Sequence, residues 1–147
     1  MKDRVRPPKN LESVLDRLKE DGVFETKQKG MMFAAAVGFG LHLGRLATME
    51  LDQFGEGIRL EYFRSPDDDG FIDTLAVAVL NDLTVMSSDR QPERIEIFEK
   101  LAAIGLAELQ RTCYDERPEY VISGALALLD ALSRSPEEGL PGLTNIL

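Results

Sequence analysis

Residues 30–44 read Gly30-Met-Met-Phe-Ala-Ala-Ala-Val-Gly-Phe-Gly-Leu-His-Leu-Gly44, a stretch without an acid or a lysine. Such a stretch must be buried if the chain folds in water. A helix that crosses a bilayer needs about 20 apolar residues, and this run is shorter and interrupted by glycine. We therefore expect a central core helix here, and no membrane association.

The ends of this core helix are predicted from capping and breaking residues. Thr26 is a suitable N-cap, because its hydroxyl accepts hydrogen bonds from amides of the first turn. The helix is then expected to run from Lys27 to about Val37. Glycine is a poor helix former, so we expect the three following glycines to end it: Gly38, Gly40 and Gly44.

Four further segments show helical periodicity. The first follows Asn10 as N-cap and ends at Gly22, a residue able to adopt a left-handed C-cap. The second is capped by Asp68 or Asp69 in the acidic turn before it. The segments are residues 11–21, 71–80, 93–114 and 119–133. In the last of them the apolar set comprises Tyr120, Ile122, Leu126, Leu129 and Leu132.

Residues 57–63 give the one clear strand signal, because apolar and charged side chains alternate along them. A single strand needs a partner. We expect that partner to be a second copy of the chain or a short segment such as Thr48–Leu51, unless residues 57–63 form only an extended connector.

These elements predict a mainly α fold, a single compact domain of about five helices with room for one short strand or hairpin. Residues 1–9 are expected to be a flexible basic arm, residues 10–134 the single helical domain and residues 135–147 a loosely held tail. A length of 147 residues fits one domain.

The net charge of −9 is unevenly distributed. Residues 1–30 carry eight basic and six acidic residues, a net of +2, which leaves −11 for the remainder. An acidic body repels phosphate, so only the amino-terminal part suits DNA. The single cysteine and a charged start without a leader segment predict a cytoplasmic protein.

Residue chemistry offers little for catalysis, cofactors or metals. His42 and Cys113 are the single histidine and cysteine, too few for a structural zinc site. The glycines after residue 37 follow a helix, whereas a dinucleotide loop opens one. Residues 65–76 match part of a calcium loop, but Ser65 and Ala76 stand where it needs acidic ligands. We expect no catalytic, cofactor or metal residues.

Basic residues near the amino terminus are the remaining candidates for a site. Lysines in the first turn of a helix are unfavourable for its dipole, which suggests another cause for their presence. They are expected to lie on ordinary surface, or to contact DNA phosphates or an acidic protein partner. The candidates are Arg4, Arg6, Lys9, Lys27, Lys29 and Arg59.

Five short motifs carry a family resemblance, and they are Arg6-Pro-Pro-Lys9, Phe24-Glu-Thr26, Phe33-Ala-Ala-Ala-Val-Gly-Phe39, Glu56-Gly-Ile-Arg59 and the run from Ser88 to Glu99. Over about residues 5–130 the chain resembles the bacterial DNA phosphorothioation-associated protein 4 family, also called Dnd system-associated protein 4. The resemblance implies an accessory protein in systems that replace a nonbridging phosphate oxygen of DNA with sulfur, or that restrict unmodified DNA in antiphage defence. It transfers no catalytic residues, so sulfur insertion would fall to partners.

The leading hypothesis is a non-enzymatic accessory protein of such a modification and restriction system. It would act through contacts with larger protein components or with a second copy, using the arm and the edge of residues 57–63. The alternative is a small DNA-binding module that uses the arm and the first two helices. A hydrolase built on the acidic clusters would need a metal.

Overall fold

The computed structural model describes residues 2–116 and 121–138. Within them lie five α-helices, short 3₁₀ segments and one two-stranded antiparallel sheet, which confirms the predicted mainly α fold. The helices are α1 (Glu12–Glu20), α2 (Lys27–His42), α3 (Phe71–Leu80), α4 (Gln91–Leu109) and α5 (Val121–Glu138). The strands are β1 (Arg4–Val5) and β2 (Ile58–Arg59).

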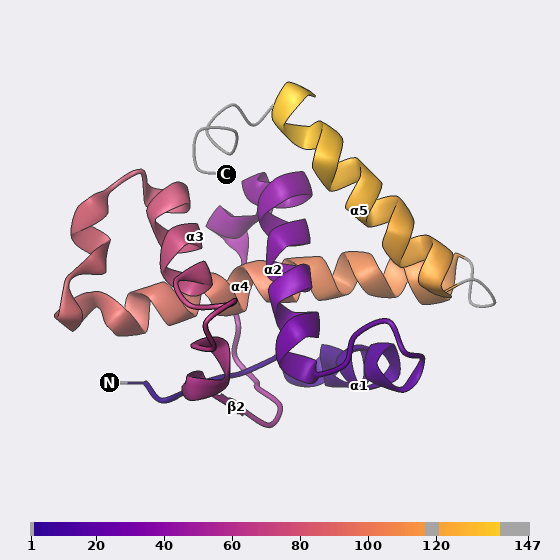
Figure 1. The fold of residues 1–147 in the computed structure, drawn as a ribbon, viewed down its shortest axis with the longest axis horizontal. Helices are drawn as coiled ribbons and strands as arrows, with labels where there is room; N and C mark the ends of the chain where they lie inside the picture. Colours follow the sequence, from indigo (N-terminus) through magenta and orange to yellow (C-terminus); the bar gives the residue numbers. More distant parts are fainter. Residues whose placement is uncertain (1, 117–120, 139–147) are drawn as a thin grey trace.

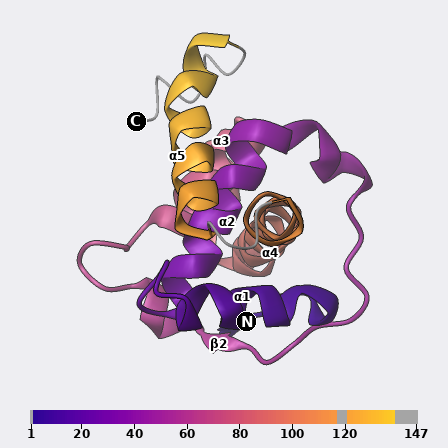
Figure 2. The same cartoon turned by 90° about the vertical axis from the view of Figure 1, so that its right-hand side faces the viewer.

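Helix α4 is the axis of the fold. Figure 1 shows α2 crossing it, with α3 on one side and α5 rising near its far end. Figure 2 looks along α4 and shows the other helices arranged around it. Accordingly, α4 is buried on most of its circumference, and Ile95, Phe98, Leu101 and Leu106 are at most 1% exposed.

The crossing of α2 and α4 corrects the predicted end of the core helix. Gly38 does not break α2, which continues to His42. A Cβ on Gly38 would lie 2.2 Å from the carbonyl oxygen of Leu101 in α4. A Cβ on Gly105 of α4 would lie 1.7 Å from the carbonyl oxygen of Ala34. Glycine therefore serves close backbone contact here, and that contact outweighs its poor helix propensity.

The prediction of a central core helix is confirmed. By length and composition alone, the residues Lys27–Thr48 also qualify as a membrane span, a test that core helices of globular proteins pass as well. In the structure four apolar residues of α2 are fully buried within the domain: Met31, Ala34, Ala35 and Val37.

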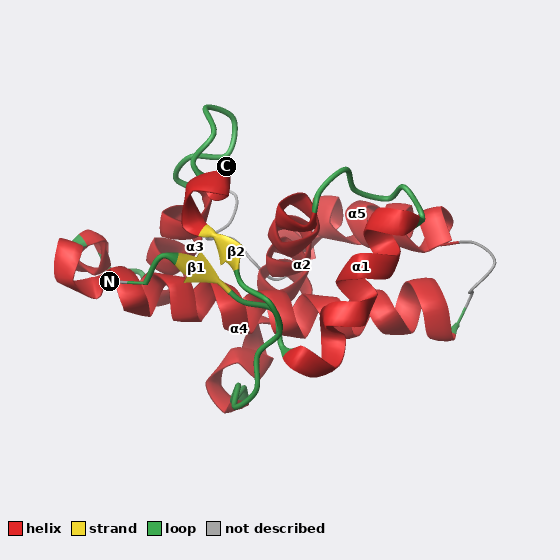
Figure 3. Ribbon diagram, turned by 90° about the horizontal axis from the view of Figure 1, so that it is seen from below, coloured by secondary structure: helices red, strands yellow, loops and turns green. Residues whose placement is uncertain are grey.

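The amino-terminal segment differs from the predicted flexible arm. Figure 3 shows β1 and β2 side by side next to α4. The strand predicted for residues 57–63 is shorter than expected, because β2 ends at Arg59 and a 3₁₀ helix, Leu60–Phe63, follows it. Arg4 pairs with Arg59 and Val5 with Ile58, so the partner of this strand is neither Thr48–Leu51 nor a second copy. The segment is held because Val5 is fully buried, which a free arm would leave exposed.

Two side chains of α4 hold this segment by its backbone. The Gln91 amide donates to the carbonyl of Lys2 at 2.6 Å and accepts from its N–H at 3.1 Å. Glu99, only 1% exposed, accepts from the Arg6 N–H at 2.7 Å and from its Nε at 3.3 Å. These bonds satisfy backbone groups of the strand segment that would otherwise need water.

The ends of the smaller helices are set by backbone geometry more than by the predicted side-chain caps. A 3₁₀ turn, Lys9–Leu11, precedes α1, so Leu11 takes the N-cap position predicted for Asn10. Gly22 has the expected left-handed φ of +76°. Helix α3 has the predicted bounds, but Gly70, with φ of +86°, precedes it in place of an aspartate cap.

Helix α5 corrects the predicted apolar face. Ala125 and Leu128 are 8% and 5% exposed, whereas Ile122, Leu126 and Leu129 of the predicted set are each more than half exposed. Leu132 of that set does pack against the core, and Tyr120 lies outside the described residues. The packed side follows from Gly124, whose absent side chain lets α5 approach the segment at Thr112 and Cys113. The helix also continues past the predicted boundary at residue 134 to Glu138, and residues 139–147 of the predicted tail lie outside the described residues.

Candidate interaction site

A groove of about 450 Å³ lies between the small sheet and the facing ends of α1 and α2. It brings together three of the predicted contact residues, Arg4, Lys27 and Arg59, and adds the cation Lys19. The other lining residues are Thr26, Gln28, Glu56, Gly57, Ile58 and Tyr62. We call this the cationic groove, because four of its ten lining residues are basic and one is acidic.

Local structure explains why residues so far apart in sequence meet here. The register of the sheet places Arg4 directly opposite Arg59. The turn at Gly22 changes the direction of the chain between α1 and α2, and Lys19 near the end of α1 lines the same groove as Lys27 at the start of α2. The groove is therefore a product of one strand pairing and one helix–turn–helix.

Two of the four cations already have carboxylate partners. Lys27 Nζ lies 2.7 Å from Asp16 Oδ1, and this hydrogen bond raises the pKa of Lys27. Arg59 Nη2 lies 2.7 Å from Glu61 Oε1, with both side chains 59% exposed. Exposed pairs of this kind contribute little stability, so an incoming anion can compete for them.

The other two cations have no carboxylate partner among the described residues. Arg4 Nη1 donates to the carbonyl of Gly57 at 3.2 Å, a neutral acceptor. Lys19 is exposed, and no acid of the described part of the chain lies within ion-pair distance of it. Sequence reasoning missed Lys19 because it lies within a regular amphipathic helix, where a lysine on the wet face is unremarkable.

The remaining predicted contact residues lie outside this groove. Lys29 Nζ is 2.6 Å from Asp68 Oδ1, and its hydrogen bond is the main cause that lowers the pKa of the Asp68 carboxyl. Arg6 binds Glu99 and lies over the ring of Phe54, 3.7 Å from its centroid. Lys9 is exposed on the 3₁₀ turn before α1. The lysines at the start of α2 thus have internal partners that offset the unfavourable dipole.

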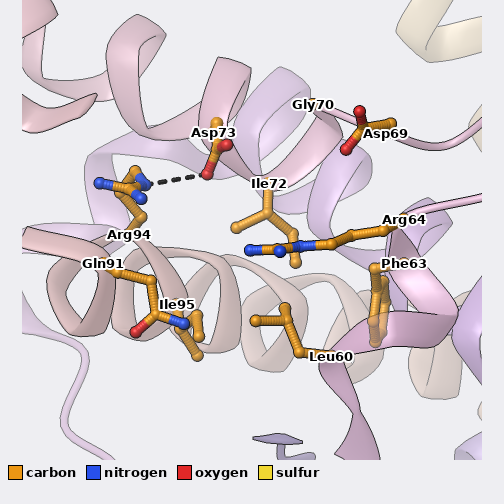
Figure 4. A pocket seen from close by; sticks show the side chains of 10 residues that line it. All are labelled: Leu60, Phe63, Arg64, Asp69, Gly70, Ile72, Asp73, Gln91, Arg94 and Ile95. Carbon is orange, nitrogen blue, oxygen red and sulfur yellow. Dashed lines mark hydrogen bonds and ion pairs between the residues drawn. The ribbon is translucent and has the colours of Figure 1, made fainter. Parts of the chain in front are cut away.

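A second hollow, drawn in Figure 4, lies between α3, α4 and residues 60–64. Its volume of about 20 Å³ admits about one water molecule. Its buried arginine, Arg94, binds Asp73 at 2.9 Å and donates to the carbonyls of Val85 and Ser87 at 2.7 and 2.8 Å. Arg94 therefore holds the turns after α3 onto α4.

The single histidine and cysteine are both placed within the packed structure. His42 Nε2 lies 3.5 Å from Glu108 Oε2 near the end of α2. Cys113 is fully buried, and burial raises the pKa of its thiol to about 11. A thiol of this kind stays protonated and unreactive at neutral pH. No three potential metal ligands of the described residues come together in a cluster.

A second surface feature is the outer face of α5. Ile122, Leu126 and Leu129 are 55%, 58% and 53% exposed and follow one another at spacings of four and three residues. This spacing is typical of a coiled-coil seam. Sequence periodicity marks both apolar faces of α5 but does not tell which one the core covers.

Comparison with known proteins agrees with the resemblance seen in the sequence. Residues 4–140 match the family described as DNA sulphur modification system-associated protein 4. No curated protein and no solved structure matches the chain. The match extends beyond the motifs on which the resemblance was based, into α5 and past its end.

Proposed function

Because the chain belongs to the DNA sulphur modification system-associated protein 4 family, we propose that it is a non-enzymatic accessory protein of a bacterial DNA phosphorothioation system. Association with a DNA sulphur modification (Dnd) system follows from the family. The proposal adds that the chain acts in the cytoplasm, through contacts with the larger protein components that modify or restrict DNA in antiphage defence.

The cationic groove is the observation that supports a binding role. A chain of net charge −9 places four basic side chains from β1, α1, α2 and β2 around one hollow. Separate elements must fold together for this to happen, so the arrangement is not a consequence of composition. Local charge of opposite sign to the rest of a protein guides partner recognition and orientation.

The placement of the reactive residues supports the non-enzymatic part of the proposal. The Cys113 thiol is buried, His42 lies beside Glu108, and Arg94 donates three hydrogen bonds to internal acceptors. Catalytic groups usually lie in a cleft with perturbed pKa values and room for a substrate. The cationic groove is lined by four cations, a tyrosine, Glu56 and Thr26, whose hydroxyl caps α2, and its lining residues include no serine, cysteine or histidine.

Co-purification tests this function. We would express the tagged chain with the other protein components encoded by the same modification system, treat the lysate with nuclease, and measure the stoichiometry of any complex. The expected result is a stable complex that survives nuclease treatment. Lys19→Glu with Arg59→Glu should weaken it, whereas Lys9→Glu with Arg45→Glu, which changes the charge equally outside the groove, should not. No complex with the wild-type chain would refute the proposal.

Direct DNA binding is the second candidate, and the same groove is the observation that favours it. The amino terminus of α2 adds positive potential beside the four cations. A phosphate-binding surface predicts that affinity for a duplex falls steeply with salt, by about 0.9 in log K per log unit of salt for each phosphate contacted. A flat salt dependence would contradict this candidate.

A further inference from the structure

The cationic groove keeps a net positive charge after its own acids are counted. Four cations face the lining residue Glu56 and the two paired acids Asp16 and Glu61, so the net charge is +1. Asp16 and Glu61 already neutralise Lys27 and Arg59. Arg4 and Lys19 remain without a carboxylate among the described residues, although both line the same hollow. The chain itself thus pairs half of the groove's cations with carboxylates and leaves the other half for an external acid.

The start of α2 adds to the preference for an anion. Thr26, Lys27 and Gln28 line the groove, so its wall includes the first turn of a 16-residue helix. The Thr26 hydroxyl accepts from the Lys29 N–H and so satisfies one amide of this turn. The partial positive charge of the helix end favours a negative group nearby.

The groove also has an apolar part. Ile58 is half-buried, and Tyr62 is 55% exposed, both on the side formed by the sheet and the 3₁₀ turn that follows it. Tyrosine is favoured at protein interfaces because its ring buries apolar area while its hydroxyl stays hydrated. Its presence favours a ligand with an apolar side chain between its charges.

We infer that the cationic groove binds a short acidic segment of a partner protein, whose two carboxylates meet Arg4 and Lys19 while an apolar side chain rests on Ile58 and Tyr62. This inference depends on the proposed function and adds to it the place and the chemistry of the contact. A groove of about 450 Å³ is in the range that holds a few side chains of a ligand.

The surroundings of the groove favour a protein segment over a nucleic acid. Duplex DNA carries a negative charge for about every 1.7 Å of its axis. It would bring many phosphates against Glu56, which lines the groove, against Asp16 and Glu61, which pair with two of its cations, and against a chain of net charge −9. A short segment brings only two acids, which can be placed at Arg4 and Lys19 and away from these three carboxylates.

The test is a titration of the full-length chain, labelled with ¹⁵N, with a synthetic decapeptide in which two Glu-Asp pairs flank one phenylalanine. Amide resonances of Thr26, Gly57, Ile58 and Tyr62 are expected to shift. A peptide with Gln and Asn in place of the acids should leave these resonances unchanged. A fluorescent form of the acidic peptide gives Kd by anisotropy.

Two matched double variants locate the binding. Arg4→Ala with Lys19→Ala should weaken peptide binding about three- to tenfold, the combined effect of two exposed ion pairs. Lys9→Ala with Arg45→Ala removes the same charge from exposed positions outside the groove and should change Kd less than about twofold. If Arg4→Ala disturbs β1, Lys19→Glu alone, on the exposed face of α1, should still weaken binding.

Three results would overturn the inference: no shift at the groove resonances, equal losses in the two double variants, or a labelled 20-base-pair duplex that binds through the groove more tightly than the peptide. The proposed function fails separately. A wild-type chain that forms no complex with its system refutes the function. A complex that persists when Arg4 and Lys19 are replaced leaves the function standing and places the contact elsewhere, with the outer face of α5 as the next surface.

Discussion

Replacing Gly105 with alanine tests the packing on which the whole fold depends. In an isolated helix this change is stabilising by about 1 kcal/mol, because alanine is the better helix former. At this position the new Cβ would lie 1.7 Å from the carbonyl oxygen and 2.8 Å from the Cα of Ala34 in α2. We therefore expect the opposite sign.

The expected loss of stability follows from how far α2 and α4 must move apart. Ordinary contact begins at 3.4 Å, and the clashing atoms belong to backbone, which cannot rotate away. The two helices must separate by about 1.7 Å, and a gap of 0.5–1 Å already removes a quarter to a half of each dispersion contact. Overpacking costs about 1–3 kcal/mol and occasionally more. A clash between two backbones lies above this range, so we take a cost of about 3–5 kcal/mol. Subtracting the gain of about 1 kcal/mol in helix propensity leaves a net destabilisation of about 2–4 kcal/mol, a large part of the usual 5–15 kcal/mol.

Gly44→Ala is the matched control. A Cβ on Gly44 meets nothing within 4 Å, and this residue has no positive φ. Here the substitution only restricts the unfolded chain and should stabilise by about 0.4–1 kcal/mol.

Urea denaturation followed by circular dichroism at 222 nm measures both variants. At a typical m-value of about 2 kcal/mol/M, Gly105→Ala should lower the midpoint by about 1–2 M and Gly44→Ala should raise it slightly. If both variants shift the midpoint upward, close contact between α2 and α4 is not what Gly105 provides.

Three further predictions concern other parts of the chain. Leu128→Ala should cost about 2–4 kcal/mol in urea unfolding and Leu129→Ala less than about 0.5 kcal/mol, since the first is 5% and the second 53% exposed; the reverse order would restore the face predicted from sequence. Asp68 has a pKa lowered below 3.8 in the folded state, chiefly by Lys29, so its stabilisation is present above pH 3.8 and lost as pH falls through the lower folded value. Asp68→Asn should therefore flatten the acid limb of stability against pH, and an unchanged acid limb would contradict the ion pair. Cys113, with a pKa of about 11, should not react with a thiol reagent at pH 8 until urea unfolds the chain, and fast labelling of the folded protein would contradict its burial.

Local sequence was sufficient to predict a helix and its buried residues where one face of the helix is apolar and a residue with a special backbone conformation marks its end. The bounds of α3 and the buried residues of α1 follow from periodicity and from Gly22. The same reasoning failed for α5, because two apolar faces alternate along it. There the absent side chain of Gly124, which lets α5 approach Cys113, selects the covered face, and this contact between two elements leaves no trace in the periodicity of α5.

The candidate site also divides into residues that local sequence identifies and a common location that only contacts between distant segments decide. Arg4, Lys27 and Arg59 were among the candidate contact residues named from the sequence, but their common location depends on the pairing of β1 with β2 and on the turn at Gly22. No local sequence pattern identified Lys19 as a contact residue. The internal partners of Lys29 and Arg6, the buried acids Asp68 and Glu99, are 39 and 93 residues away.

The sequence by itself determined that this chain has a mainly α fold around residues 30–44, that its charge is concentrated in an acidic body, and that it is related to a DNA modification system. These follow from composition, periodicity and motifs, which are properties of neighbouring residues. Only the tertiary structure decided that the glycines of α2 and α4 form a close helix crossing instead of a helix end. Within its own helix a glycine lowers stability, and it raises stability only where the backbone of another helix occupies the space of its missing Cβ.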